Sequence, residues 1–123
     1  MRVLVADDHS LFRDGIISLL EAAGFEPVGQ VGDGHAAVEA TRRLRPDLVL
    51  MDIQLPERDG FSLLQDIRRD VPATRVVALT AHAMAGDRER AIGAGFDEYI
   101  TKPIDIRAFP AQIAAALQKR SPG

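Results

Sequence analysis

The sequence of 123 residues contains no cysteine and no long apolar run. Without cysteine it can form neither disulfides nor thiolate zinc sites. No apolar stretch approaches the roughly 18 residues of a membrane span, and no cleavable leader precedes the core strand that we expect from Val3. We therefore expect a cytoplasmic protein that does not associate with membranes.

Basic residues are also slightly fewer than acidic residues. The chain has 15 lysines and arginines against 18 aspartates and glutamates, which gives a net charge of −3. A nucleic-acid surface normally appears as a basic stripe, whereas the clusters Arg42-Arg43-Arg45 and Arg68-Arg69 each fall on the polar side of a predicted helix. We expect both clusters to be solvated and the domain not to bind nucleic acid directly.

The composition that remains is that of a globular domain. Hydrophobic residues make up 46% of the chain and charged residues 27%, which is typical of soluble proteins with one core. We expect one domain over residues 1–120 and a frayed tail over residues 121–123. A strand that starts at Val3 leaves no room for an upstream domain, so we expect a stand-alone domain to which only a continuation beyond Lys119 could add an output module.

Short apolar runs alternate with longer amphipathic segments along the whole chain. The alternation predicts an α/β protein with a doubly wound parallel sheet and five flanking helices. The expected strands cover residues 3–6, 26–31, 48–51, 76–79 and 98–100. The expected helices cover residues 10–23, 35–44, 60–69, 83–94 and 105–119.

The strands differ in a way that predicts their order. The first, third and fourth are continuous apolar runs, as expected for strands covered on both faces. The second contains Pro27 and the fifth begins at Asp97-Glu98, so both belong at edges. Right-handed crossovers then give the order 2-1-3-4-5, the flavodoxin-like arrangement. Pro110 falls inside the expected last helix and should kink or delay it.

Polar residues follow the strands where each strand ends. Asp7 and Asp8 follow the first strand, Asp52 the third, Thr80 the fourth and Lys102 the fifth. Ligands of such sheets bind beyond the carboxyl ends of the strands, near the switch point. The sequence therefore predicts that three carboxylates, a hydroxyl and an ammonium group converge at one rim.

Three neighbouring carboxylates repel one another, and a divalent cation removes the conflict. Oxygen ligands without histidine or cysteine favour Mg²⁺, with Mn²⁺ as the alternative. Lys102 and Thr80 are then suited to bind phosphoryl oxygens. Asp52 lies between the metal side and the Lys102 side, so we expect it to be the nucleophile that forms an acyl phosphate.

With these residues in place, the chain resembles a response-regulator receiver domain, the phosphoacceptor module of two-component signalling. The resemblance covers about residues 2–119. It rests on Asp7-Asp8, on Met51-Asp52 with Leu55-Pro56 and Asp59-Gly60 behind it, on Thr80-Ala81, and on Tyr99-Ile100-Thr101-Lys102-Pro103.

The resemblance implies a role for each acidic residue. Asp52 would accept a phosphoryl group from a phosphohistidine on a histidine kinase or a histidine-phosphotransfer protein. Asp8 would bind Mg²⁺ directly and Asp7 mostly through water. The backbone carbonyl of Gln54 would be a further metal ligand.

The resemblance also implies a phosphate-binding group and a switch. Thr80, the Ala81 amide and Lys102 would hold the phosphoryl oxygens, and the Lys102–Pro103 bond would be cis. Tyr99 matches the aromatic switch residue of the family and would respond to Thr80. As an edge-strand tyrosine, Tyr99 could instead simply cover the sheet.

Other residues are assigned to the surroundings of the site. Gln54 and His82 match positions that border the phosphate and tune the phosphoryl lifetime. The histidines at positions 9, 35 and 82 lack the mutual spacing of a metal site; we expect His9 and His82 at the rim of the pocket and His35 on a helix surface. The expected partner surface consists of Leu11, Gly15, Pro103 and Ile104.

Two other functions use similar residues. A phosphohydrolase of the haloacid dehalogenase type needs an Asp-x-Asp pair after the first strand, but here Asp8 is followed by His9 and Ser10. A phosphate-independent protein-binding module on the same fold would not need an intact site. We therefore expect a signalling domain and not an enzyme, whose downstream target the sequence does not name.

Overall fold

The computed structural model describes residues 1–55, 58–81 and 84–118. The described strands are β1 (Arg2–Ala6), β2 (Glu26–Val31), β3 (Leu48–Asp52), β4 (Arg75–Thr80) and β5 (Glu98–Thr101). The described helices are α1 (Ser10–Ala22), α2 (Gly34–Leu44), α3 (Gly60–Asp70), α4 (Asp87–Ala94) and α5 (Phe109–Gln118). The strands are parallel in the order β2-β1-β3-β4-β5, which confirms the predicted fold. None of these helices is long and apolar enough to cross a membrane.

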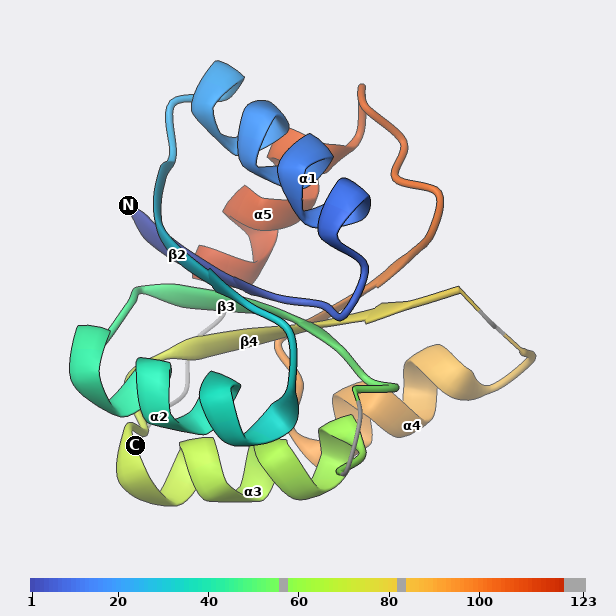
Figure 1. The fold of residues 1–123 in the computed structure, drawn as a ribbon. Helices are drawn as coiled ribbons and strands as arrows, with labels where there is room; N and C mark the ends of the chain where they lie inside the picture. The colour runs from blue at the N-terminus through green and yellow to red at the C-terminus, as the bar shows by residue number, and fades with distance from the viewer. Residues whose placement is uncertain (56–57, 82–83, 119–123) are drawn as a thin grey trace.

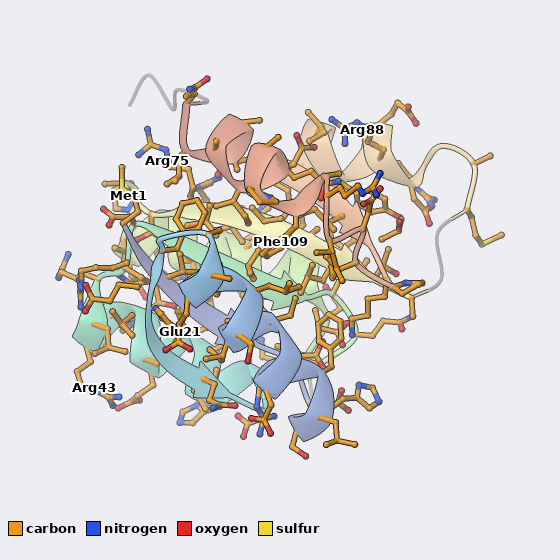
Figure 2. The ribbon with its side chains drawn as sticks, turned by 90° about the horizontal axis from the view of Figure 1, so that it is seen from above. Met1, Glu21, Arg43, Arg75, Arg88 and Phe109 are labelled. Atoms are coloured by element: carbon orange, nitrogen blue, oxygen red, sulfur yellow. The ribbon has the colours of Figure 1, made fainter. Side chains whose placement is uncertain are left out.

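The sheet separates two apolar layers. Helices α1 and α5 lie on one face, and α2, α3 and α4 lie on the other (Figure 1). Successive side chains of a strand point to opposite faces, so Val3 and Val5 join the first layer while Leu4 and Ala6 join the second. Phe109, the first residue of α5, is buried in the first layer and lies near the centre of the view in Figure 2.

The edge strand β5 is held by buried ionic contacts. Asp97 is only 8% exposed, and its Oδ2 accepts hydrogen bonds from the Val76 amide (2.8 Å) and the Arg68 guanidinium (2.6 Å). Arg68 also donates to the carbonyls of Thr74 and Gly95. The expectation that Arg68 is solvated is therefore wrong, because this carboxylate and these carbonyls draw its guanidinium to the sheet edge. The other arginines of the two clusters are exposed.

Helix α4 begins later than the sequence pattern predicts. Within the described residues it starts at Asp87, whereas the pattern predicts a start at position 83. Gly86 adopts the left-handed conformation with φ 86°, which is incompatible with a helix interior. The Asp87 carboxylate accepts a hydrogen bond from the Met84 amide (2.9 Å). A separate turn therefore precedes the helix.

Helix α5 also begins late, at Phe109 and not at Asp105. The Asp105 side chain accepts hydrogen bonds from the amides of Arg107 (3.0 Å) and Ala108 (3.2 Å), which stabilises a turn before the helix. Pro110 then stands in the first helical turn, where its missing N–H breaks no helical hydrogen bond. Of the two predicted effects of Pro110, the structure shows the delay.

Glycine is required where α3 meets the segment after β3. A Cβ atom at Gly60 would lie 2.7 Å from the Cα of Ile53, and this backbone cannot yield as a flexible side chain does. We expect Gly60→Ala to lower the free energy of unfolding by about 1–3 kcal/mol in urea melts. Gly93→Ala in α4 is the matched control, because nothing lies within 4 Å of the position that its Cβ atom would occupy. Equal free energies of unfolding for the two variants would contradict the close approach of Gly60 to Ile53.

Candidate functional site

The predicted residues meet at the carboxyl ends of the strands. Asp7 follows β1 and Asp52 ends the adjacent strand β3, since Ala6 is in register with Met51. Lys102 follows β5, the neighbour of β4, which ends in Thr80. The parallel register therefore brings together groups that are far apart in sequence.

Lys102 joins two of the carboxylates. Its Nζ lies 2.5 Å from Asp7 Oδ2 and 3.2 Å from Asp52 Oδ2. The side chain of Asp7 is fully buried, and those of Asp52 and Lys102 are 6% and 12% exposed. Burial alone would lower the pKa of Lys102, but the hydrogen bond to Asp7 and the charges of Asp52 and Asp7 outweigh it and raise the pKa. The ammonium is therefore charged at neutral pH and offsets part of the carboxylate repulsion.

Further contacts fix the carboxylates and the lysine. The Gln54 amide donates to Asp52 Oδ1 at 2.8 Å. The Arg13 guanidinium donates to the Asp7 carbonyl at 2.5 Å and to the Gln30 side chain at 2.9 Å, and so links the end of β1 to β2. The Lys102 ammonium also lies 4.3 Å from the centre of the Phe12 ring. Sequence reasoning gave Arg13 and Phe12 no role at the site, because their contacts depend on how α1 packs.

Carboxylates gather at the same rim. Asp7, Asp8, His9 and Asp52 each offer one ligand atom, and these atoms all lie within 4.8 Å of one another. The Asp8 side chain is 35% exposed, whereas that of Asp7 is fully buried. Three carboxylates, whose charge one ammonium group offsets only in part, provide a set of oxygen ligands that fits a hard divalent cation. The prediction from sequence placed His9 at the rim but did not include it among the ligands.

Thr80 and Tyr99 line one cavity on the α2–α4 side of the sheet. The cavity has a volume of about 340 Å³ and is lined by Ile53, Gln54, Phe61, Thr80, Asp87, Arg90 and Tyr99. Tyr99 is 8% exposed and belongs to the apolar layer, so it does cover the sheet. Its buried hydroxyl has no hydrogen-bond partner in the described part of the chain.

An apolar groove opens on the other side of Lys102. It has a volume of about 660 Å³ and is lined by Leu11, Phe12, Gly15, Ile16, Leu19, Ala81, Lys102, Pro103, Ile104 and Ile106. All four residues of the predicted partner surface are among them. The Lys102–Pro103 peptide bond is cis. Leu11 and Ile106 are 85% and 67% exposed, so large apolar side chains face solvent at the groove.

The remaining predicted residues are exposed or lie outside the described part of the chain. His35 is exposed on α2, where its Nε2 lies 3.9 Å from the Glu39 carboxylate. Ala81 is exposed directly after β4. His82, Pro56 and the tail at residues 121–123 lie outside the described residues.

The sheet order defines a flavodoxin-like α/β protein, and the acidic cluster lies at the switch point between β1 and β3, where ligands of such sheets bind. The family model of the response regulator receiver domain matches residues 3–114. The chain belongs to this family, and is a signalling domain of the two-component type.

Individual relatives agree with this assignment. The transcriptional regulatory protein PdtaR of Mycobacterium tuberculosis is 38% identical over 120 residues, which cover 96% of this chain and 57% of PdtaR. Other curated relatives are covered to a similar extent, so the chain spans about half the length of several relatives that it matches.

Solved structures show the same fold. The signal receiver domain of the putative response regulator NarL from Mycobacterium tuberculosis superimposes with a TM-score of 0.88 at 30% identity, covering 97% of each chain. The receiver domain of the sensor histidine kinase PA1611 from Pseudomonas aeruginosa superimposes with a TM-score of 0.83 at 31% identity, covering 96% of this chain and 98% of its own. That receiver holds a magnesium ion in its active-site cleft.

Proposed function

We propose that the chain is a phosphoacceptor switch or shuttle, which takes a phosphoryl group from a partner phosphohistidine onto Asp52. The observation that carries the proposal is the position of Asp52, which belongs to the acidic cluster and also accepts a hydrogen bond from Lys102. In the transfer, an Asp52 oxygen forms the new bond to phosphorus while the bond from phosphorus to the imidazole nitrogen breaks. The partner is a histidine kinase or a histidine-phosphotransfer protein.

Mg²⁺, or Mn²⁺ with the same ligands, would neutralise charge on the carboxylates and the phosphoryl oxygens. Asp7, Asp8, Asp52 and the Gln54 carbonyl would hold it. The acidic cluster supports a metal ion here, and the magnesium ion in the active-site cleft of the PA1611 receiver domain supports the choice of Mg²⁺. The ammonium of Lys102, which contacts Asp52, would bind phosphoryl oxygens.

Thr80, Ala81, Gln54 and His82 complete the proposed site. The Thr80 hydroxyl and the Ala81 amide hold the remaining phosphoryl oxygens. We assign to Gln54 and His82, from the resemblance alone, the role of tuning the phosphoryl lifetime; His82 lies outside the described residues. We assign the domain to residues 1–120, in the cytoplasm, without direct contact to nucleic acid.

Labelling with acetyl phosphate and Mg²⁺ tests the function. A stable label of one equivalent supports the phosphoacceptor. Turnover of many equivalents would indicate a phosphohydrolase, and no labelling would indicate a phosphate-independent binding module. The sequence Asp8-His9-Ser10 disfavours the hydrolase, and the intact set of carboxylates and Lys102 disfavours the binding module.

The switch is proposed to run from Thr80 to Tyr99. Both line the same cavity, and phosphorylation adds about two negative charges with three acceptor oxygens. A Thr80 hydroxyl that turns toward those oxygens changes the packing around the Tyr99 ring. The coupling needs to be only about 1–3 kcal/mol to matter.

Tyr99 reports on this coupling, because it is the only tyrosine and the chain has no tryptophan. We expect beryllofluoride with Mg²⁺ to change the near-ultraviolet tyrosine signal in the wild type but hardly in Thr80→Ala. Phe61→Leu, which alters the same cavity without removing the hydroxyl, is the control that should retain a response. An equal response in wild type and Thr80→Ala would remove Thr80 from the proposed switch.

The apolar groove is the proposed docking site of a phosphodonor helix that carries the phosphohistidine. Lys102 lines the groove and also contacts Asp52, so a helix seated there would stand beside the acceptor. The exposed Leu11 and Ile106 offer apolar area to such a helix. A large exposed apolar surface of this kind is a common mark of a protein-binding site.

A charge placed in the groove should separate docking from chemistry. We expect Ile106→Glu to slow phosphotransfer at least about tenfold, corresponding to about 1.4 kcal/mol of binding energy, from any histidine kinase that phosphorylates the wild type. Labelling by acetyl phosphate should not change, because this small donor needs no docking surface. Met84→Glu is the matched control, since Met84 is 73% exposed but does not line the groove. Equal loss with both donors would assign Ile106 to the chemistry or to folding.

A further inference from the structure

A histidine ring lies against the acidic cluster. His9 Nδ1 is 3.2 Å from Asp7 Oδ1 and 3.0 Å from Asp8 Oδ1. The backbone amide of His9 also donates to Asp7 Oδ1, at 2.9 Å, which fixes the start of the side chain beside the carboxylate. The imidazole itself is 70% exposed, so it is free to turn toward or away from the cluster.

The spacing of these atoms is that of neighbouring metal ligands. With metal–ligand distances of about 2.1 Å, adjacent ligands of an octahedral ion are about 3.0 Å apart. Around a tetrahedral Zn²⁺ the same separation is about 3.3 Å. The distances of 3.0 and 3.2 Å from Nδ1 to the two carboxylates match these values. The nitrogen therefore stands where a third ligand atom would stand beside two oxygens.

We propose that His9 gives the site an imidazole ligand and thereby a preference for first-row transition-metal ions, such as Zn²⁺, over Mg²⁺. The inference rests on the proposed metal site at Asp7, Asp8 and Asp52. Mg²⁺ favours oxygen ligands and leaves the ring unused, whereas Zn²⁺ binds imidazole nitrogen well. A Zn²⁺ ion that replaces the Nδ1 proton would find one nitrogen and carboxylate oxygens already in position.

Within the described residues, neither Lys102 nor His35 offers the same ligand. The Lys102 ammonium is protonated at neutral pH, because its pKa is raised. His35 lies on the surface of α2, beside Glu39 and not in the cluster. Among the described residues, the group of ligand atoms at Asp7, Asp8, His9 and Asp52 is the one that could hold a metal ion.

Calorimetric titration with Zn²⁺ and with Mg²⁺ tests the proposal on the full chain. We expect wild type to bind Zn²⁺ more tightly than Mg²⁺. His9→Gln and His9→Asn should weaken Zn²⁺ binding at least about tenfold, the loss expected on removing a ligand or its close support. Their affinity for Mg²⁺ should not change. His35→Gln is the matched control and should bind both ions as the wild type does.

The NMR resonance of the His9 imidazole nitrogen gives a direct readout. It should shift when Zn²⁺ is added but not when Mg²⁺ is added. Equal Zn²⁺ affinities of His9→Gln and His35→Gln would overturn the inference, as would a loss seen in His82→Gln but not in His9→Gln. Absence of Mg²⁺ binding in the wild type, with Zn²⁺ bound through His9, would instead overturn the Mg²⁺-dependent function. The two failures are thus distinguishable.

Discussion

Asp52→Asn should abolish incorporation of a phosphoryl group from acetyl phosphate. An amide oxygen is a poor nucleophile and forms no acyl phosphate, whereas the carboxylate can. The fold should survive, because asparagine has nearly the same shape and can still accept the hydrogen bond that Gln54 donates to Oδ1. The measurement is labelling at saturation with Mg²⁺, together with circular dichroism to confirm folding.

Asp14→Asn is the control for this result. Asp14 is exposed on α1 and is absent from the acidic cluster, so labelling should equal that of the wild type. Full labelling of Asp52→Asn would move the acceptor to another carboxylate, and the same experiment on Asp7→Asn and Asp8→Asn would then find it.

The second large effect should follow removal of the Lys102 charge. In Lys102→Met the stem can still pack near Phe12, but two nearly buried carboxylates lose the cation that contacts both. We expect the free energy of unfolding without Mg²⁺ to fall by about 3 kcal/mol, the loss typical of an uncompensated buried charge. Added Mg²⁺ should restore part of it, because the ion supplies positive charge to the same carboxylates.

The pH dependence of this stabilisation follows from the raised pKa of Lys102. The charged ammonium stabilises the folded state fully at pH values below its ordinary pKa of 10.5. This stabilisation is lost as the pH rises through the higher pKa that Lys102 has in the folded state. Urea melts at a pH of about 8 therefore compare a charged wild type with an uncharged variant. In Asp52→Asn/Lys102→Met one carboxylate is gone as well, so this double variant should be at least about 1 kcal/mol more stable than additivity predicts. Strict additivity would contradict the proposed charge compensation.

The sequence predicts the fold and which charged groups meet at the rim of the sheet, for physical reasons. Apolar runs such as Leu48–Asp52 show which strands are covered on both faces, and therefore the order of the sheet. Parallel strands end at a common edge, so Asp7, Asp52 and Lys102 could be placed together before any distance was known. Position along a strand is the information that the sequence carries most directly.

Contacts between side chains of different elements are harder to predict. Arg68 looks like a solvated helix residue until its guanidinium is seen beside Asp97, which is distant in sequence. The ring of His9 turns back onto Asp7 and Asp8, a rotamer that the pattern of residues does not encode. The late starts of α4 and α5 depend on turns at Gly86 and Asp105, where local hydrogen bonds compete with helix formation.

The late start of α5 has a consequence for how this protein can change during evolution. Ile104 and Ile106 belong to a connecting segment, and the backbone of that segment carries no sheet or helix ladder. Substitutions there can alter the rim of the groove while Lys102 and the strands keep their positions. If the groove is the proposed docking site, two copies that arise by gene duplication can diverge in which kinase they recognise and escape crosstalk, while both retain the proposed acceptor Asp52.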